Sequence, residues 1–242
     1  MKSIIQINFF EEGINVKALF VNGSPRKNWN THKMLESAMK GASDSGADCE
    51  MIHLYDYSFT GCKSCFACKL KNNKTNGLCV LRDDLRPVLE KALASDVLVM
   101  GSPIYFSHPT GMLYSFLERL LFPVLSYNGK YNEETHAMES RILTRDIYTA
   151  MIYTMGYPDD EGIKDFGYPE MFRENERFLG GLFGHCETLY AYNTYQFSDY
   201  SHYDVAEVIE PMKAKWREER FPEDLKRAYD LGKRLTEKAG KK

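Results

Sequence analysis

The chain has 242 residues, of which 43% are hydrophobic and 27% charged, and its net charge is −3. This composition supplies a sizeable core and excludes an intrinsically disordered chain, and the length suits one large domain. The nearly balanced charge predicts no nucleic-acid partner.

The first twenty residues are apolar in two short pieces separated by Glu11 and Glu12. No small-residue cleavage site follows, so we expect no signal peptide. No uncharged run is long enough to span a bilayer, and we expect a cytoplasmic protein without a membrane partner. In a reducing compartment the six cysteines are ligands or thiols rather than disulfides.

Short apolar runs alternate with helical periodicity along most of the chain. Asn30 or Thr31 is the predicted cap of the first helix, and a charged helix is expected over roughly 223–238. This alternation implies a doubly wound, five-stranded parallel sheet with helices on both faces, whose ligands bind beyond the carboxyl ends of the strands. The expected strands are residues 16–21, 50–54, 96–100, 147–153 and 188–193.

We expect a single domain over residues 1–242 with a core of about 15–195, from which two segments depart. One is a cysteine-bearing excursion over 58–82. The other is a polar insertion over 123–146, and a segment of this kind is more often a lid, an interface or a mobile loop than filler.

The first strand runs directly into NGSPRKNWNT and then into a helix. This loop matches neither the dinucleotide nor the triphosphate glycine pattern. It offers the hydroxyls of Ser24 and Thr31, the amide of Asn30 and the guanidinium of Arg26 at a helix start. Those groups suit a phosphomonoester without a metal. An ordinary capped turn is the alternative, because caps and turns favour the same residue types.

Two further loops follow buried strands and should lie beside the first. The next strong strand ends in GSPIYFSHPTGM, whose apolar and aromatic residues could line a flat slot, and a later strand ends in YTMGYP. Together the three loops predict a mononucleotide with a flat ring, and FMN is the leading candidate. The candidate ring contacts are Ser102, Pro103, Ile104, Tyr105, Phe106, Thr154, Met155 and Gly156.

The segments GSPRKNWNT and GSPIYFSHPTGMLYSFLERL resemble the signature loops of the flavodoxin-like NAD(P)H-dependent FMN reductases. The cysteine run between them is similar to that of the iron–sulfur flavoproteins of the same superfamily. The resemblance covers roughly residues 16–156 and implies a flavodoxin-like fold, with Trp29 standing where the family usually has a small residue. It assigns the FMN phosphate to Ser24, Arg26, Asn30 and Thr31, the isoalloxazine ring to residues 102–106, and closure of the site to residues 154–156.

Four cysteines lie within one polar stretch. Cys62, Cys65 and Cys68 can wrap one face of a small cluster, and Cys79, after ten intervening residues, can supply a fourth thiolate. The spacing and the neighbouring flavin loops favour a [4Fe–4S] cluster; zinc and unligated thiols remain alternatives. Nearby lysines could offset the charge of a cluster or simply be solvated: Lys63, Lys69, Lys71 and Lys74.

We therefore expect an FMN-dependent oxidoreductase that takes electrons from NAD(P)H or from a ferredoxin-type donor. The resemblance implies a homodimer or homotetramer in which the cysteine excursion reaches a neighbouring subunit's flavin. The alternatives are a cluster-free NAD(P)H:quinone or FMN reductase and a non-catalytic electron carrier. The isolated Cys49 is expected to pack as a small apolar residue, and a nucleophilic role for Cys186 is disfavoured.

Overall fold

The computed structural model describes residues 16–72, 75, 78–127, 131–132, 137–138, 143, 145–158, 164 and 167–241. The segment on which the signal-peptide prediction rests lies outside these residues, apart from its last few positions. Within the described part of the chain, no helix has the length and apolar character needed to cross a membrane.

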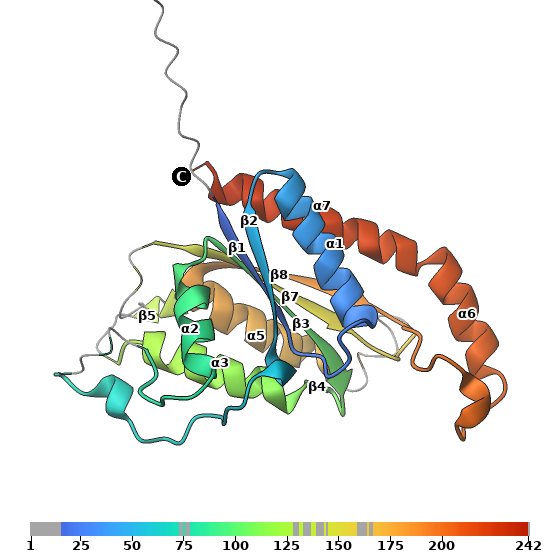
Figure 1. The fold of residues 1–242 in the computed structure, drawn as a ribbon, viewed down its shortest axis with the longest axis horizontal. Helices are drawn as coiled ribbons and strands as arrows, with labels where there is room; N and C mark the ends of the chain where they lie inside the picture. Colours follow the sequence, from blue (N-terminus) through green and yellow to red (C-terminus); the bar gives the residue numbers. More distant parts are fainter. Residues whose placement is uncertain are drawn as a thin grey trace, which may run out of the picture.

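A parallel sheet forms the centre of the molecule (Figure 1). Its strand order is β2-β1-β3-β7-β8, and every neighbouring pair on this path is parallel. This confirms the flavodoxin-like doubly wound sheet. A short strand, β4, pairs antiparallel with the end of β3 and was not predicted. The strands are β1 (Lys17–Asn22), β2 (Asp48–His53), β3 (Val97–Tyr105), β4 (His108–Pro109), β7 (Ile147–Thr154) and β8 (Gly184–Ala191).

Helices cover both faces of the sheet because its central strands are apolar on both sides. In β1, Ala18 and Phe20 join the core under α1 and α7, whereas Leu19 and Val21 join the core under α2, α3 and α5. The helices are α1 (Asn30–Asp44), α2 (Leu85–Ala94), α3 (Gly111–Val124), α5 (Tyr168–Phe183), α6 (Ile209–Glu219) and α7 (Phe221–Ala239). Short 3-10 turns occur at η1 (Leu54–Asp56), η2 (Ala67–Lys69) and η3 (Tyr200–His202).

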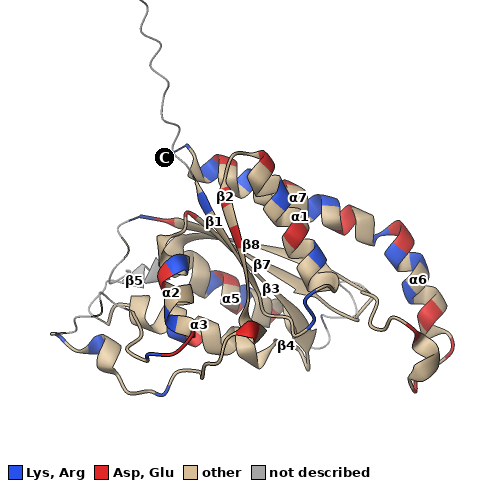
Figure 2. Ribbon diagram, viewed as in Figure 1, with Lys and Arg blue, Asp and Glu red and all other residues tan. Residues whose placement is uncertain are grey.

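Two helix predictions need correction. The N-cap of α1 is Trp29, whose side chain makes no capping hydrogen bond. The two predicted caps do not serve, because the side chains of Asn30 and Thr31 make hydrogen bonds to other loops. The expected terminal helix is present as α7, but α6 precedes it. The sequence did not predict α6 because it has no apolar stripe: Lys213 is its one buried residue. Along α6 and α7 basic and acidic residues are interspersed (Figure 2).

The polar insertion is described only in part. Pro123 and Val124 are the last residues of α3. Two strands of two residues each, β5 (Tyr131–Asn132) and β6 (Ala137–Met138), pair antiparallel. Most of the remaining insertion lies outside the described residues. Its role as a lid, interface or mobile loop stays a prediction.

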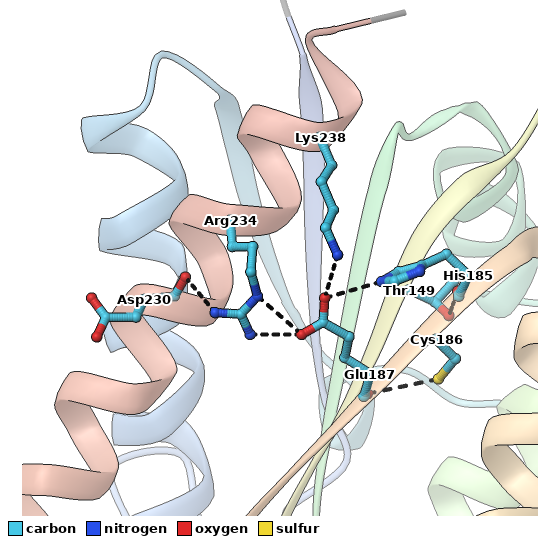
Figure 3. Close-up of polar contacts among 7 residues, drawn as sticks. All are labelled: Thr149, His185, Cys186, Glu187, Asp230, Arg234 and Lys238. Atoms are coloured by element: carbon cyan, nitrogen blue, oxygen red, sulfur yellow. Dashed lines mark hydrogen bonds and ion pairs between the residues drawn. The ribbon is translucent and has the colours of Figure 1, made fainter.

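A carboxylate on the edge strand β8 fastens the last helix to the sheet (Figure 3). Glu187 accepts from Lys238 Nζ at 3.0 Å, lies 3.0 Å from His185 Nε2, and accepts from Arg234 Nη2 at 2.6 Å. Burial alone would raise the pKa of Glu187, but the hydrogen bonds from these partners lower it to about 2. The carboxylate is therefore ionised wherever the protein is folded near neutral pH.

Two glycines allow α1 and α7 to pack with their backbones almost in contact. A Cβ atom on Gly232 would lie 1.9 Å from the carbonyl oxygen of Ala38, and one on Gly41 would lie 2.0 Å from that of Tyr229. No side chain can occupy that space without separating the helices. The close packing of α7 on α1 therefore requires glycine at both positions.

We expect Gly232→Ala to lower the free energy of unfolding by about 3 kcal/mol or more, because overpacking against backbone cannot relax locally. Gly180→Ala is the matched control within α5, since its Cβ would meet nothing closer than 3.7 Å. That control should gain roughly 0.5–1 kcal/mol from helix propensity. Urea unfolding measures both, and equal stabilities for the two variants would contradict the assignment.

Candidate functional site

Three loops meet at the carboxyl ends of β1, β3 and β7. Gly23 N donates to Gly101 O at 2.8 Å, and Thr110 Oγ1 donates to Gly23 O at 2.7 Å. Across the cleft, the hydroxyls of Thr31 and Thr154 lie 2.7 Å apart. The turn that begins at Gly23 is therefore hydrogen-bonded to Gly101 and Thr110 on either side of the β3–β4 hairpin. Gly101 itself lies within β3, which runs to Tyr105 and so passes residue 100, where we expected the strand to end.

Both glycines are needed for this approach. A Cβ on Gly23 would lie 2.9 Å from Leu113 Cβ, and one on Gly101 would lie 2.8 Å from Leu35 Cδ1. The start of α3 packs against the first loop and α1 against the second. A larger residue at either position would move a helix that presents the site.

Most of the predicted FMN contacts line one cleft between these loops. Ser102 lies beneath it, fully buried, where its hydroxyl accepts from Thr110 N at 2.9 Å and orders the second loop. Phe106 lies outside it, 99% exposed, at the tip of the β3–β4 hairpin. The predicted residues that line the cleft are Ser24, Arg26, Asn30, Thr31, Pro103, Ile104, Tyr105, Thr154, Met155 and Gly156.

Three side-chain donors of the first loop point at backbone oxygens of the segment after β8. Arg26 Nη1 donates to Gln196 O at 2.5 Å, while Trp29 Nε1 and Asn30 Nδ2 donate to Tyr195 O at 2.9 and 2.7 Å. These contacts leave only about 50 Å³ of free space in the cleft, far less than the roughly 300 Å³ or more of a typical ligand site. A phosphate would offer the same donors equivalent acceptor oxygens, so the donor set fits FMN once the Tyr195–Gln196 segment withdraws.

Sequence reasoning missed Asn22, which shapes the first loop from below. Asn22 is fully buried, its Oδ1 accepts from Ser24 N at 2.9 Å, and its Nδ2 lies 3.1 Å from His53 Nδ1. Burial, followed by the charge of His32, lowers the pKa of His53. A neutral ring keeps an acceptor nitrogen available for Asn22. An asparagine ending a buried strand just before a turn was the available signal.

Sequence reasoning also missed Lys213. Its Nζ donates to Gly156 O and Asn193 Oδ1, each at 3.0 Å, and to Thr194 O at 3.4 Å, and the residue is only 3% exposed. Burial lowers its pKa to about 8. Lys213 holds the loop that follows β7 to the segment after β8. The sequence did not indicate this role, because Lys213 lies in a helix that is otherwise polar and solvent-facing.

The four predicted ligand cysteines, Cys62, Cys65, Cys68 and Cys79, line one small cavity together with Arg119. Nowhere in the described residues do three or more His, Cys, Asp or Glu side chains gather closely enough to hold a metal ion. A four-iron cluster spaces its thiolates farther apart than a single ion does, so a shared cavity is the relevant test. Arg119 Nε is buried without a hydrogen-bond partner. Four sulfurs beside a buried guanidinium suit an anionic thiolate-bound cluster in their chemistry. The cavity itself has only about 20 Å³ of free space, room for about one water molecule, so a cluster fits only if the excursion moves outward.

The other two cysteines lack the character of reactive thiols. Burial, and then the charge of Asp48, raises the pKa of Cys49 to about 11; burial raises that of Cys186 to about 12. Thiols that stay protonated are weak nucleophiles. This agrees with the packing role expected for Cys49 and with the rejection of Cys186 as a nucleophile.

A larger apolar cavity of about 580 Å³ lies between α3, α5 and the cysteine excursion. Cys62 contributes to its wall from the excursion side. Three of its aromatic side chains are strongly exposed: Phe66, Tyr127 and Phe178.

Comparison with known proteins agrees with this geometry. Residues 16–138, half of the chain, match the family described as NADPH-dependent FMN reductase. An iron–sulfur flavoprotein of Archaeoglobus fulgidus is 38% identical over 104 residues, which are 43% of this chain and 48% of the relative. An iron–sulfur flavoprotein of Methanosarcina thermophila is 27% identical over 43% of this chain and 52% of its own length. The chain thus spans about half the length of the curated relatives it matches.

Solved structures share the fold at low identity. An NAD(P)H:quinone oxidoreductase from Methanothermobacter marburgensis aligns with a TM-score of 0.62 at 17% identity, covering 91% of this chain and 97% of that one. An azoreductase from Bacillus anthracis aligns with a TM-score of 0.60 at 16% identity, covering 90% and 99%.

The sheet order and the joined loops at the carboxyl ends of its strands define a flavodoxin-like α/β protein. The family match then identifies the chain more closely. It belongs to the NADPH-dependent FMN reductase family.

The buried Lys213 predicts a pH dependence of stability. Its pKa is about 8 when folded, against 10.5 for an ordinary lysine, so the unfolded chain binds more protons between these values. Wild-type stability should therefore rise relative to Lys213→Met between about pH 8 and 10, by no more than about 3 kcal/mol.

Urea unfolding across this pH range measures the difference. Lys215→Met, an exposed site on the same helix, should give a curve parallel to that of the wild type. A parallel curve for Lys213→Met as well would show that Lys213 is not the buried charge described above.

Proposed function

We propose that this protein is an FMN-dependent oxidoreductase that takes electrons from NAD(P)H or a ferredoxin-type donor and passes them to an acceptor, with a [4Fe–4S] cluster near the flavin. The single observation that carries this proposal is the junction of the Gly23 and Gly101 turns over a cleft lined by phosphate-type donors. FMN, when bound, supplies the hydride and single-electron chemistry.

The chain's own residues bind and orient. Arg26 and Asn30 would donate to the phosphate in place of the carbonyl oxygens they now contact. The Thr31–Thr154 pair joins the phosphate side to the ring side, and Lys213 supports Gly156 behind the ring. None of these residues needs to act as an acid or base.

The cysteine excursion would supply the second redox centre. Cys62, Cys65, Cys68 and Cys79 would ligate a cluster, which supplies one-electron transfer when bound. Burial raises the pKa of Cys68, while the positive charge of Lys69 acts in the opposite direction. Lys69 itself donates to the carbonyls of Phe122 and Leu125 at the end of α3, and so ties the excursion to that helix.

The proposed assembly is a homodimer or homotetramer. Its support is the apolar cavity between α3, α5 and the cysteine excursion, with its exposed aromatic side chains, because contiguous exposed apolar surface marks interaction sites. The physiological acceptor would reach the redox centres from the same side, where Cys62 faces both cavities.

A cluster-free NAD(P)H:quinone or FMN reductase is the second candidate. The observation that favours it is the small cavity that the four cysteines share, which has only about 20 Å³ of free space. The names of the structural neighbours, a quinone oxidoreductase and an azoreductase, are compatible with it.

Arg26→Gln tests the flavin site. We expect the protein to bind FMN more tightly than riboflavin, and the variant to lose about 10- to 100-fold in FMN affinity, the size of one lost charge-assisted hydrogen bond. Riboflavin affinity should not change. Flavin fluorescence quenching measures both, with the exposed Arg173→Gln on α5 as control. A wild type that binds no FMN, or that binds riboflavin equally well, would falsify the site.

Cys68→Ser separates the two candidate functions. In anaerobically purified protein we expect the variant to lose iron and sulfide but to keep FMN, because Cys68 lines the cavity of the four cysteines and does not line the proposed FMN cleft. Cys49→Ser is the control and should keep both. Iron and sulfide analysis with a visible spectrum gives the answer. Wild-type protein with flavin and NAD(P)H oxidation but no iron would favour the cluster-free reductase.

A further inference from the structure

Arg119 of α3 is an arginine buried at the base of the cysteine excursion. It is only 1% exposed. Its Nη1 and Nη2 donate to Asp83 Oδ2 and Oδ1 at 2.5 and 2.8 Å, and Nη1 also donates to Thr60 O at 3.0 Å. The Arg119–Asp83 ion pair differs from a surface ion pair, because the guanidinium is removed from water and would be costly to leave without its partner.

These contacts join the two ends of the excursion. Thr60 lies near the start of the excursion and Asp83 directly follows its end, so the Arg119 side chain holds these two chain segments together. We call this junction the neck of the excursion. The Asp83 carboxylate also accepts from the backbone of Leu85 and Thr60, and although burial would raise the pKa of Asp83, its hydrogen bond and charge contact with Arg119 lower it. Beyond the neck, Cys62 N donates to Glu118 Oε2 at 2.9 Å. The cysteines are thus presented from a fixed base.

The Arg119 guanidinium also reaches the sulfur cavity. Its Nη atoms donate to Asp83 and Thr60, and a hydrogen bond and charge interaction with Cys79 join those with Asp83 in raising the pKa of Arg119, against the effect of burial. Its Nε is buried and has no hydrogen-bond partner. Arg119 lines the cavity that the four cysteines share. Of the other cations at this cavity, Lys63 is exposed, and the nearby Lys69 binds the end of α3. Among the described residues that line this cavity, Arg119 is the cation that is removed from water.

We propose that Arg119 is a positioning residue of the cysteine cavity that raises the reduction potential of the cluster bound there. It would do so through its buried charge and its free Nε–H, both of which favour the more negative, reduced form of a thiolate-bound cluster. Asp83 fixes the guanidinium and offsets part of its charge. This inference rests on the proposed function, because it requires the cluster.

Two substitutions should shift the potential in opposite directions. Arg119→Gln removes the positive charge, and we expect about a tenfold lower ratio of reduced to oxidised cluster at a fixed solution potential, which equals about 59 mV for a one-electron couple. Asp83→Asn leaves Arg119 uncompensated and should raise that ratio. Arg119→Lys, which keeps the charge but loses the fork and Nε, should fall between wild type and Arg119→Gln. Arg82→Gln, at an exposed arginine three residues from Cys79, should match wild type.

The measurement is an EPR-monitored potentiometric titration of protein reconstituted anaerobically with iron and sulfide. Limited proteolysis of the same variants reports the neck, and a merely structural role would loosen Arg119→Gln and Asp83→Asn alike without opposite shifts in potential. If Arg119→Gln retains no cluster, Asp83→Asn and Arg119→Lys decide. Loaded variants that share the wild-type potential overturn this inference alone. A wild type that takes up no iron overturns it together with the proposed cluster.

Discussion

The hydrogen bond between the Gly23 amide and the Gly101 carbonyl is the contact on which the rest of the site depends. It closes the gap between the first two loops directly beyond the β1–β3 pairing, where Asn22 is in register with Gly101. The absence of side chains at both turns lets α1 and α3 begin immediately behind them. The predicted cofactor contacts lie in the first loop and the start of α1, in the last part of β3 and just beyond it, and at the end of β7.

Two salt-linked attachments hold the peripheral parts to this core. Glu187 fastens α7 to the edge strand, and Arg119 with Asp83 closes the neck of the cysteine excursion. The first is partly open to solvent and binds Arg234, Lys238 and His185; the second is buried, and its arginine also reaches Cys79. The second attachment therefore connects the fold to the proposed ligand cysteines, whereas the first connects only a helix and a strand.

The segment after β8 connects function to conformation. Its backbone carbonyls occupy Arg26, Trp29 and Asn30, and Lys213 ties it to Gly156. The donors that we propose for a phosphate therefore hold backbone oxygens in this structure. In the proposed site this segment would have to withdraw for FMN to enter, since the cleft has only about 50 Å³ of free space.

The doubly wound parallel sheet and the two glycine loops were readable from local pattern, because hydrophobic periodicity and turn chemistry depend on near neighbours in the chain. Ten of the twelve residues predicted to contact FMN line one cleft, and the contacts themselves stay a prediction. The hydrogen bond of Asn30 to Tyr195 in place of a cap, the helix α6, and the roles of Asn22, Lys213 and Arg119 were not readable from local pattern. These side chains bind residues that are distant in the sequence, as Arg119 binds Asp83 and Thr60. Burial of a charged side chain is decided only when distant elements pack around it, and no local spacing records that event.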